Sequence, residues 1–164
     1  MIVERSPVEW ALLPIQRFGQ FSGRAPRAEY WWYYLGTVII GFVVGIIDRI
    51  IGSDIGILGL VVNLALLVPT IAVTVRRLHD TERSGWWILA VIVPLVAVGA
   101  MVGAGIFDGN LGSSPTPFFW VSLFLLIVAA VMLFIFMILP GTDGPNRYGE
   151  DPYKPHDHLE EIFG

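Results

Sequence analysis

The chain has 164 residues, of which 55% are hydrophobic and only 15% are Asp, Glu, Lys or Arg, whereas roughly 25% of an average soluble domain is charged. With a mean hydropathy of +0.69, it has too few polar side chains to cover the surface of a water-soluble domain. The net charge of −4 provides no basic face, so we expect no nucleic-acid partner. Because the chain contains no cysteine, disulfides, thiolate catalysis and cysteine-ligated metals are excluded.

The first predicted element is a short helix that begins after Ser6. The segment Ser6-Pro7-Val8-Glu9 matches a capping box with proline at the first helical position, and Pro14 predicts a bend before Gly19. We expect this helix to lie flat on the inner leaflet, because there is no soluble core to receive it. The apolar side chains expected to contact the leaflet are Trp10, Leu13, Ile15 and Phe18. After it, Pro26 predicts the start of a long helix that continues into the first membrane span.

Four apolar stretches are long enough to cross a hydrocarbon layer about 30 Å thick at about 1.5 Å per residue. They cover residues 32–51, 55–75, 86–107 and 118–139. Because they lack the alternating pattern of barrel strands, we predict an all-α integral membrane protein, a four-helix bundle of transmembrane helices. The expected division is a cytoplasmic N-terminal segment at 1–31, a transmembrane domain at 32–139 and a cytoplasmic acidic tail at 140–164.

The basic residues are distributed unevenly between the two ends of the predicted spans. Apart from Arg49, every Lys and Arg precedes the first span, lies between the second and third, or follows the fourth. Because Lys and Arg favour the cytoplasmic side, we expect both termini to lie inside the cell. The aromatic run 30–34 and the pair Trp86-Trp87 open two of the spans, as interfacial anchors do.

The spans themselves contain few polar residues, and no ionisable group lies near the bilayer midplane. For Asn63 we favour an interhelical hydrogen bond that stabilises packing over a substrate site. Asp48 and Arg49 are expected to pair with each other or with Asp54. Two pairs of glycines four residues apart predict close helix packing within the chain, with dimerisation as the alternative. These glycines are Gly41, Gly45, Gly99 and Gly103.

Three polar clusters flank the spans on the side that we expect to be cytoplasmic. Their sequences are FGQFSGRAPRAEYWW at 18–32, RRLHDTERSGWW at 76–87 and GTDGPNRYGEDP at 141–152. Each basic residue near anionic headgroups gains about 1 kcal/mol, but the carboxylates compete for the same arginines. We favour an interlocked Arg–carboxylate layer that holds the loops in place. The alternative is a specific headgroup or phosphate site built from the same arginines. The candidate lipid- or partner-binding residues are Arg24, Arg27, Glu29, Arg76, Arg77, His79, Asp80, Arg83 and Arg147.

His79 next to Asp80 raises the hypothesis of acid–base catalysis. Adjacent residues rarely pair with each other, and a hydrolase or transferase would need both groups to converge with Arg24 or Arg147 over an open pocket. We therefore expect a histidine that packs or caps the loop, no catalytic residue and no enzymatic activity. The tail segment His156-Asp157-His158 is more typical of a solvated surface than of a metal site, so we expect neither a metal nor a cofactor.

In this order, and separated by apolar spans, the three clusters resemble domain-of-unknown-function family 805, the YhaH-like bacterial inner-membrane proteins. The resemblance covers about residues 14–152 and implies a multi-pass protein of the bacterial inner membrane. It implies no reaction, substrate or cofactor. Glu82 stands where the family often has glycine or another small or polar residue, and Pro26 stands where serine is common, so local loop geometry is expected to differ there.

Together these features predict a non-enzymatic membrane module. Its expected partners are membrane lipids, in particular anionic headgroups, or a partner membrane protein or second copy, bound through the Arg/carboxylate/aromatic layer. The alternative is a small channel or transporter with a pathway between the spans near Asn63 and Pro69. This alternative predicts a continuous wettable cavity at mid-depth.

Overall fold

The computed structural model describes residues 5–53, 56–107 and 117–153. Its regular elements are α1 (Pro7–Gln16), α2 (Arg27–Ile51), α3 (Ile57–Asp80), the 3-10 helix η1 (Gly85–Ile88), α4 (Leu89–Phe107) and α5 (Pro117–Ile138). The stretches long and apolar enough to cross a membrane are α2, α3, Gly85–Gly105 and α5. The prediction of an all-α protein with four transmembrane helices is therefore confirmed.

Two helices extend further than the apolar pattern indicated. The helix α2 begins at Arg27, directly after the extended residue Pro26, which confirms the long helix predicted from Pro26 and starts the helix before the apolar run at residue 32. The helix α3 continues past the apolar run, through Arg76 and Arg77, to Asp80. Charged residues end a hydrophobic run without ending a helix, because these side chains are buried against partners of opposite charge.

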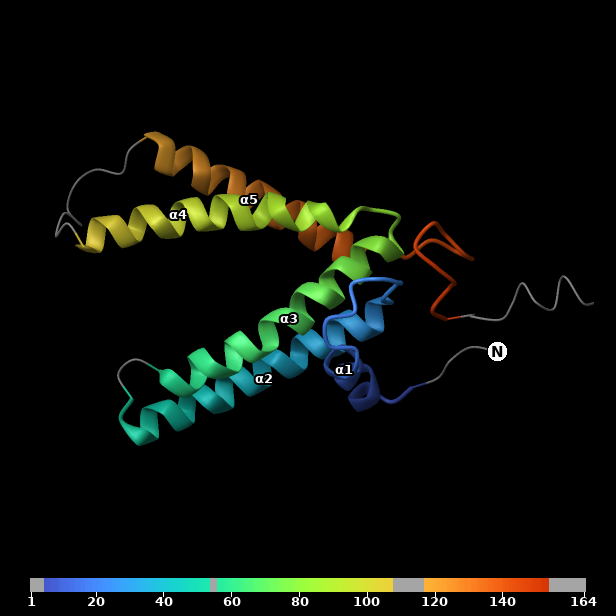
Figure 1. Cartoon of the computed structure of the whole chain (residues 1–164), viewed down its shortest axis with the longest axis horizontal. Helices are drawn as coiled ribbons and strands as arrows, with labels where there is room; N and C mark the ends of the chain where they lie inside the picture. Colours follow the sequence, from blue (N-terminus) through green and yellow to red (C-terminus); the bar gives the residue numbers. More distant parts are fainter. Residues whose placement is uncertain (1–4, 54–55, 108–116, 154–164) are drawn as a thin grey trace, which may run out of the picture.

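The transmembrane helices form two antiparallel hairpins, α2–α3 and α4–α5, which diverge from one common end (Figure 1). Contacts are extensive within each hairpin, whereas between the hairpins α5 makes smaller contacts with α2 and α3. We call the common end the junction; α2 and η1 begin there, and α3 and α5 end there. The side of the membrane that the junction faces stays a prediction based on the positive residues.

The capping box of α1 is confirmed. The backbone N–H of Ser6 donates to Glu9 Oε2 at 2.7 Å, and the N–H of Glu9 donates to Ser6 Oγ at 3.3 Å. Pro14 lies inside the helix, which continues to Gln16. The chain then turns at Gly19, whose φ of +73° favours glycine.

The apolar side chains of α1 are divided between two environments. Trp10 and Leu13 are buried in the protein, because α1 packs against α2 and α3 at the junction. The expectation that these two side chains contact the leaflet is therefore wrong. Ile15 and Phe18 are exposed, and their contact with lipid stays a prediction.

At the far end of the α2–α3 hairpin, Asp48 caps the following helix. Its carboxylate accepts the backbone N–H groups of Leu58 at 3.1 Å and Gly59 at 2.7 Å. These donors belong to the first turn of α3 and have no partner within the helix, and a negative charge there also complements the helix dipole. The expected pairing with Arg49 is not found among the residues described, and Asp54 lies outside them.

Two expectations about packing inside the membrane are not met by contacts within the described residues. A Cβ atom at any of the four paired glycines would meet no atom within 4 Å, so these glycines form no close helix contact within the described chain. They are Gly41, Gly45, Gly99 and Gly103. The side chain of Asn63 donates to the carbonyl of Gly59 at 2.7 Å, within its own helix rather than to a neighbouring one. Both results follow from the open arrangement of the helices in the spans.

Candidate functional site

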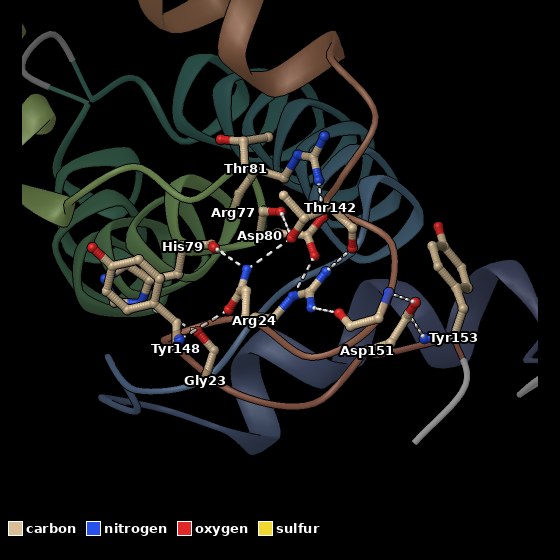
Figure 2. A network of polar contacts seen from close by, with 12 residues as sticks. Gly23, Arg24, Arg77, His79, Asp80, Thr81, Thr142, Tyr148, Asp151 and Tyr153 are labelled. Carbon is tan, nitrogen blue, oxygen red and sulfur yellow. Dashed lines mark hydrogen bonds and ion pairs between the residues drawn. The ribbon is translucent and has the colours of Figure 1, made fainter. Parts of the chain in front are cut away.

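Buried charged side chains gather at the junction. We define the polar layer as Arg24, Glu29, Arg76, Arg77 and Asp80, all of which have at most 6% of their surface exposed. They come from the loop before α2, from the first turn of α2 and from the last turns of α3. The segment after α5 folds back over this layer (Figure 2).

Asp80 is the centre of one half of the polar layer. Its Oδ1 accepts a hydrogen bond from Arg24 Nε at 2.9 Å, and its Oδ2 accepts one from Arg77 Nη1. Figure 2 shows the two guanidinium groups converging on the carboxylate. The two guanidinium groups donate hydrogen bonds to the carboxylate, which accepts them away from water, and a buried charge requires such partners.

Arg24 also attaches the C-terminal segment to the layer. Its Nη1 donates to the carbonyl of Gly144 and its Nη2 to the carbonyl of Thr142, each at 2.5 Å. The N–H of Thr142 in turn donates to the carbonyl of Asp80 at 2.9 Å. A Cβ at Gly141 would overlap the Asp80 carboxylate, so glycine is required for this close approach.

Arg77 connects the two hairpins. Its Nε donates to the carbonyl of Met137 at 3.3 Å, and its Nη2 donates to the carbonyl of Leu139. These carbonyls lie at the end of α5, where the last C=O groups of a helix have no intrahelical partner and carry the negative end of the helix dipole. A guanidinium group from α3 therefore satisfies the C-terminus of α5.

The other half of the layer is an ion pair between α2 and α3. Arg76 Nη1 lies 2.8 Å from Glu29 Oε1, and both side chains are 1% exposed. The pair lacks the angular alignment of a hydrogen bond. Arg17 Nη1, from the loop after α1, lies 3.7 Å from the second oxygen of Glu29. The carboxylate thus links three segments of the chain.

His79 and Asp80 face different partners. His79 Nδ1 lies 3.2 Å from the carbonyl of Gly23, and its ring stacks on Tyr148 with centroids 3.9 Å apart. Asn146 donates to the main-chain carbonyl of His79 at 3.0 Å. The hypothesis of a His79–Asp80 acid–base pair is wrong, because the carboxylate is held by the two arginines. The histidine packs the loop, as the sequence indicated.

The remaining candidates lie outside the buried layer. Arg27 Nη1 donates to the carbonyl of Ile138 at 3.4 Å, and the Arg83 guanidinium lies 4.0 Å from the centroid of the Phe136 ring. Arg147 donates to the carbonyl of Glu82 at 2.8 Å. Within the described chain, none of these three arginines forms an ion pair with a carboxylate. The structure therefore separates buried, paired arginines from accessible ones.

Two small cavities adjoin the polar layer. One of about 190 Å³ is lined in part by Arg27, Asp143 and Asp151, and one of about 280 Å³ in part by Arg17 and Glu29. Among the residues that the structure describes, no group of three or more His, Asp or Glu side chains is placed to hold a metal. The tail segment 156–158 lies outside those residues.

Fold and site together define a class: a four-span α-helical membrane protein whose hairpins meet at a buried layer of arginines and carboxylates. The chain belongs to the family described as "Protein of unknown function (DUF805)", which it matches over residues 18–150. This confirms the resemblance seen in the three sequence clusters.

Several relatives in Escherichia coli (strain K12) are similar over most of the chain. "Inner membrane protein YhaI" is 32% identical over 145 residues, covering 88% of this chain and 96% of that protein. "Inner membrane protein YhaH" is 30% identical over 149 residues, with 88% and 97% covered, and "Uncharacterized protein YiiR" is 32% identical over 137 residues, with 80% and 84% covered. No solved structure matches. The chain is a multi-pass inner membrane protein, as its sequence predicted.

Proposed function

We propose that this protein is a non-enzymatic membrane module that binds anionic lipid headgroups through the rim of the junction. The observation that carries the proposal is a group of exposed or half-buried arginines and aromatic rings around the end of α5. We define the rim as Arg27, Trp31, Arg83, Trp87 and Phe136. The proposal leaves out the buried arginines of the polar layer, because at most 6% of their surface is exposed.

The rim combines the two residue types that favour a headgroup layer. Arg83 and Trp87 contact the same Phe136 ring, the tryptophan edge-on with centroids 5.5 Å apart. Trp31 contacts Phe134, two residues earlier in α5, and Arg27 reaches the carbonyl of Ile138. Tryptophan rings are enriched at the membrane–water interface, and each arginine there gains about 1 kcal/mol from anionic lipid.

Native mass spectrometry from nanodiscs that contain phosphatidylglycerol and phosphatidylcholine tests this proposal. We expect the unmodified protein to retain phosphatidylglycerol preferentially. The double variant Arg27→Gln/Arg83→Gln is expected to lose about tenfold or more in this preference, because two contributions of about 1 kcal/mol are removed.

Arg49→Gln is the matched control for this experiment. Arg49 is exposed at the opposite end of α2 and has no ion-pair partner within the described chain, so its substitution removes one arginine charge away from the rim, where the double variant removes two at the rim. Equal lipid retention in all three proteins would refute the proposal. A loss of free energy in the Arg49 variant at least half as large as that in the double variant would also refute it, because the effect would then follow net charge alone.

The alternative of a channel or transporter has less support. The cavity near Asn63 is lined by residues of α2, α3 and the turn between them, with none from α4 or α5 among the residues described. It is therefore a groove on one hairpin rather than a pathway enclosed by both. Pro69 is buried beside it and does not line it.

A further inference from the structure

The helix α1, which lies beside the start of α2 (Figure 1), leaves a row of apolar side chains exposed. Val8, Leu12 and Ile15 are 67%, 44% and 41% exposed. At about 100° per residue around the helix axis, these three positions lie within about 60° of one another. Phe18, just after the helix, is 59% exposed. We define the outer face of α1 as these four residues.

A contact with α2 fixes the level of the middle of α1. A Cβ atom at Gly36 would lie 3.9 Å from the Cβ of Ala11, so α1 packs directly on α2 at this glycine. Gly36 belongs to the apolar stretch 32–51 and lies about 6 Å past its first residue, at about 1.5 Å per residue. The middle of α1 is therefore level with the hydrocarbon side of the membrane boundary.

Both ends of α1 lie on the polar side of this boundary. Arg5 precedes the helix and Arg17 follows it, and both line the cavity of about 280 Å³ beside Glu29, a residue that comes before the apolar stretch. Trp10 contacts Tyr153 of the C-terminal segment, with ring centroids 6.4 Å apart. A helix with two polar ends and its middle against an apolar stretch runs along a membrane surface rather than across it.

The apolar and polar side chains of α1 are arranged to match this position. Val8 and Ile15 lie within about 60° of Ala11 around the helix axis, on the side of the contact with Gly36. Glu9 and Gln16 are exposed and lie about 140–160° from Ala11. The side turned toward the apolar stretch is thus apolar, and the side turned away from it is polar, as in helices that lie in a membrane interface.

We propose that the outer face of α1 binds the acyl chains of the leaflet at the junction, which makes α1 an in-plane membrane anchor. Trp32 and Ile40 lie one turn before and one turn after Gly36 on α2 and are 40% and 38% exposed. Because α2 crosses the membrane, lipid covers this side of α2, and the same lipid layer continues onto α1. The contact needs no headgroup charge, so the proposal does not depend on lipid binding at the rim.

Site-directed spin labelling of the full-length protein in phosphatidylcholine liposomes tests this placement, and the chain has no cysteine of its own to remove. Labels at Val8→Cys and Ile15→Cys should collide more often with oxygen, which concentrates in hydrocarbon, than with a water-soluble nickel complex. Their expected depth is about 5–10 Å below the interface. Gln16→Cys is the matched control on the same helix and should show the reverse preference. Phe42→Cys, at a position of α2 that is 71% exposed, provides the reference for acyl chains.

The reaction of the unlabelled cysteines with a charged maleimide in bicelles provides a second measurement. Ile15→Cys should react at least about tenfold more slowly than Gln16→Cys, because a thiol among acyl chains forms less of the reactive thiolate. Both positions are exposed, so the substitutions leave the packing of α1 intact. Equal reaction rates would overturn the proposal, as would nickel collisions at Val8 and Ile15 as frequent as those at Gln16, because the outer face would then lie in water.

Discussion

At the scale of single residues, Asp80 explains how charges accumulate at the end of a membrane-spanning helix. Its carboxylate is shared by Arg24 and Arg77, whose remaining N–H groups bind main-chain carbonyls after and within α5. Every one of these contacts is made inside the protein, so they stabilise the chain and leave little of the charge for an external ligand.

Glu82 gives a prediction at this scale. It has a φ of +59°, the left-handed conformation that disfavours a residue with a Cβ. We expect Glu82→Gly to raise the free energy of unfolding by up to about 1 kcal/mol, since glycine adopts this conformation without strain but loses more entropy on folding. Denaturant unfolding in detergent micelles measures the change.

Glu82→Ala is the control, because alanine removes the carboxylate and keeps the Cβ. If glycine were no more stabilising than alanine, backbone strain at this turn would not be the cause. The sequence predicted that the local loop geometry differs from that of the family at Glu82. It did not reveal which backbone angle the turn requires.

At the scale of elements, the sequence predicted where helices exist better than where they end. The run of apolar residues identified all four spans, and the pattern Ser6-Pro7-Val8-Glu9 identified α1 with its cap. The continuation of α3 to Asp80 could not be predicted, because it depends on ion pairs with segments remote in sequence. The cap that Asp48 provides for α3 was missed, because Asp48 lies within α2, outside the N-cap position of α3.

The N-terminus of α1 should depend on pH. Hydrogen bonds from Ser6, chiefly from its backbone N–H, hold the pKa of the Glu9 carboxyl below its usual value of 4.5. Since the pKa is lower in the folded state, the stabilisation is present above pH 4.5 and is lost as the pH falls through the lowered value. We expect the first turn of α1 to loosen only in acid below the usual carboxyl range.

Carbon-13 NMR checks this dependence. The chemical shift of the Glu9 carboxyl and the backbone chemical shifts that report helix in α1 are recorded from neutral pH to about pH 3. In a Glu9→Gln variant the first turn should show no such transition in the same range. A Glu9 midpoint at or above 4.5 would contradict the account.

At the scale of the whole molecule, the two hairpins meet at the junction and diverge in the spans. The uneven distribution of arginines predicted that the three polar clusters lie on one side of the spans. In the structure, residues of all three clusters are in contact with one another. The sequence could not predict the open arrangement of the helices, because apolar faces that contact lipid and apolar faces that contact each other have the same composition. For the same reason the glycine pairs were expected to pack within the chain.

The central claim is that the buried polar layer is a structural core, and a double-mutant cycle on Arg24 and Asp80 tests it most directly. Unfolding free energies would be measured in lipid bicelles for Arg24→Met, Asp80→Asn and the double variant, with Arg27→Met as the exposed control. We predict that Asp80→Asn costs about 3–5 kcal/mol, because it leaves two buried guanidinium groups without their carboxylate. Arg27→Met should change stability by less than about 0.5 kcal/mol. A coupling energy of about 1–3 kcal/mol between Arg24 and Asp80 is the predicted result, and single effects that add to within about 0.5 kcal/mol would contradict it.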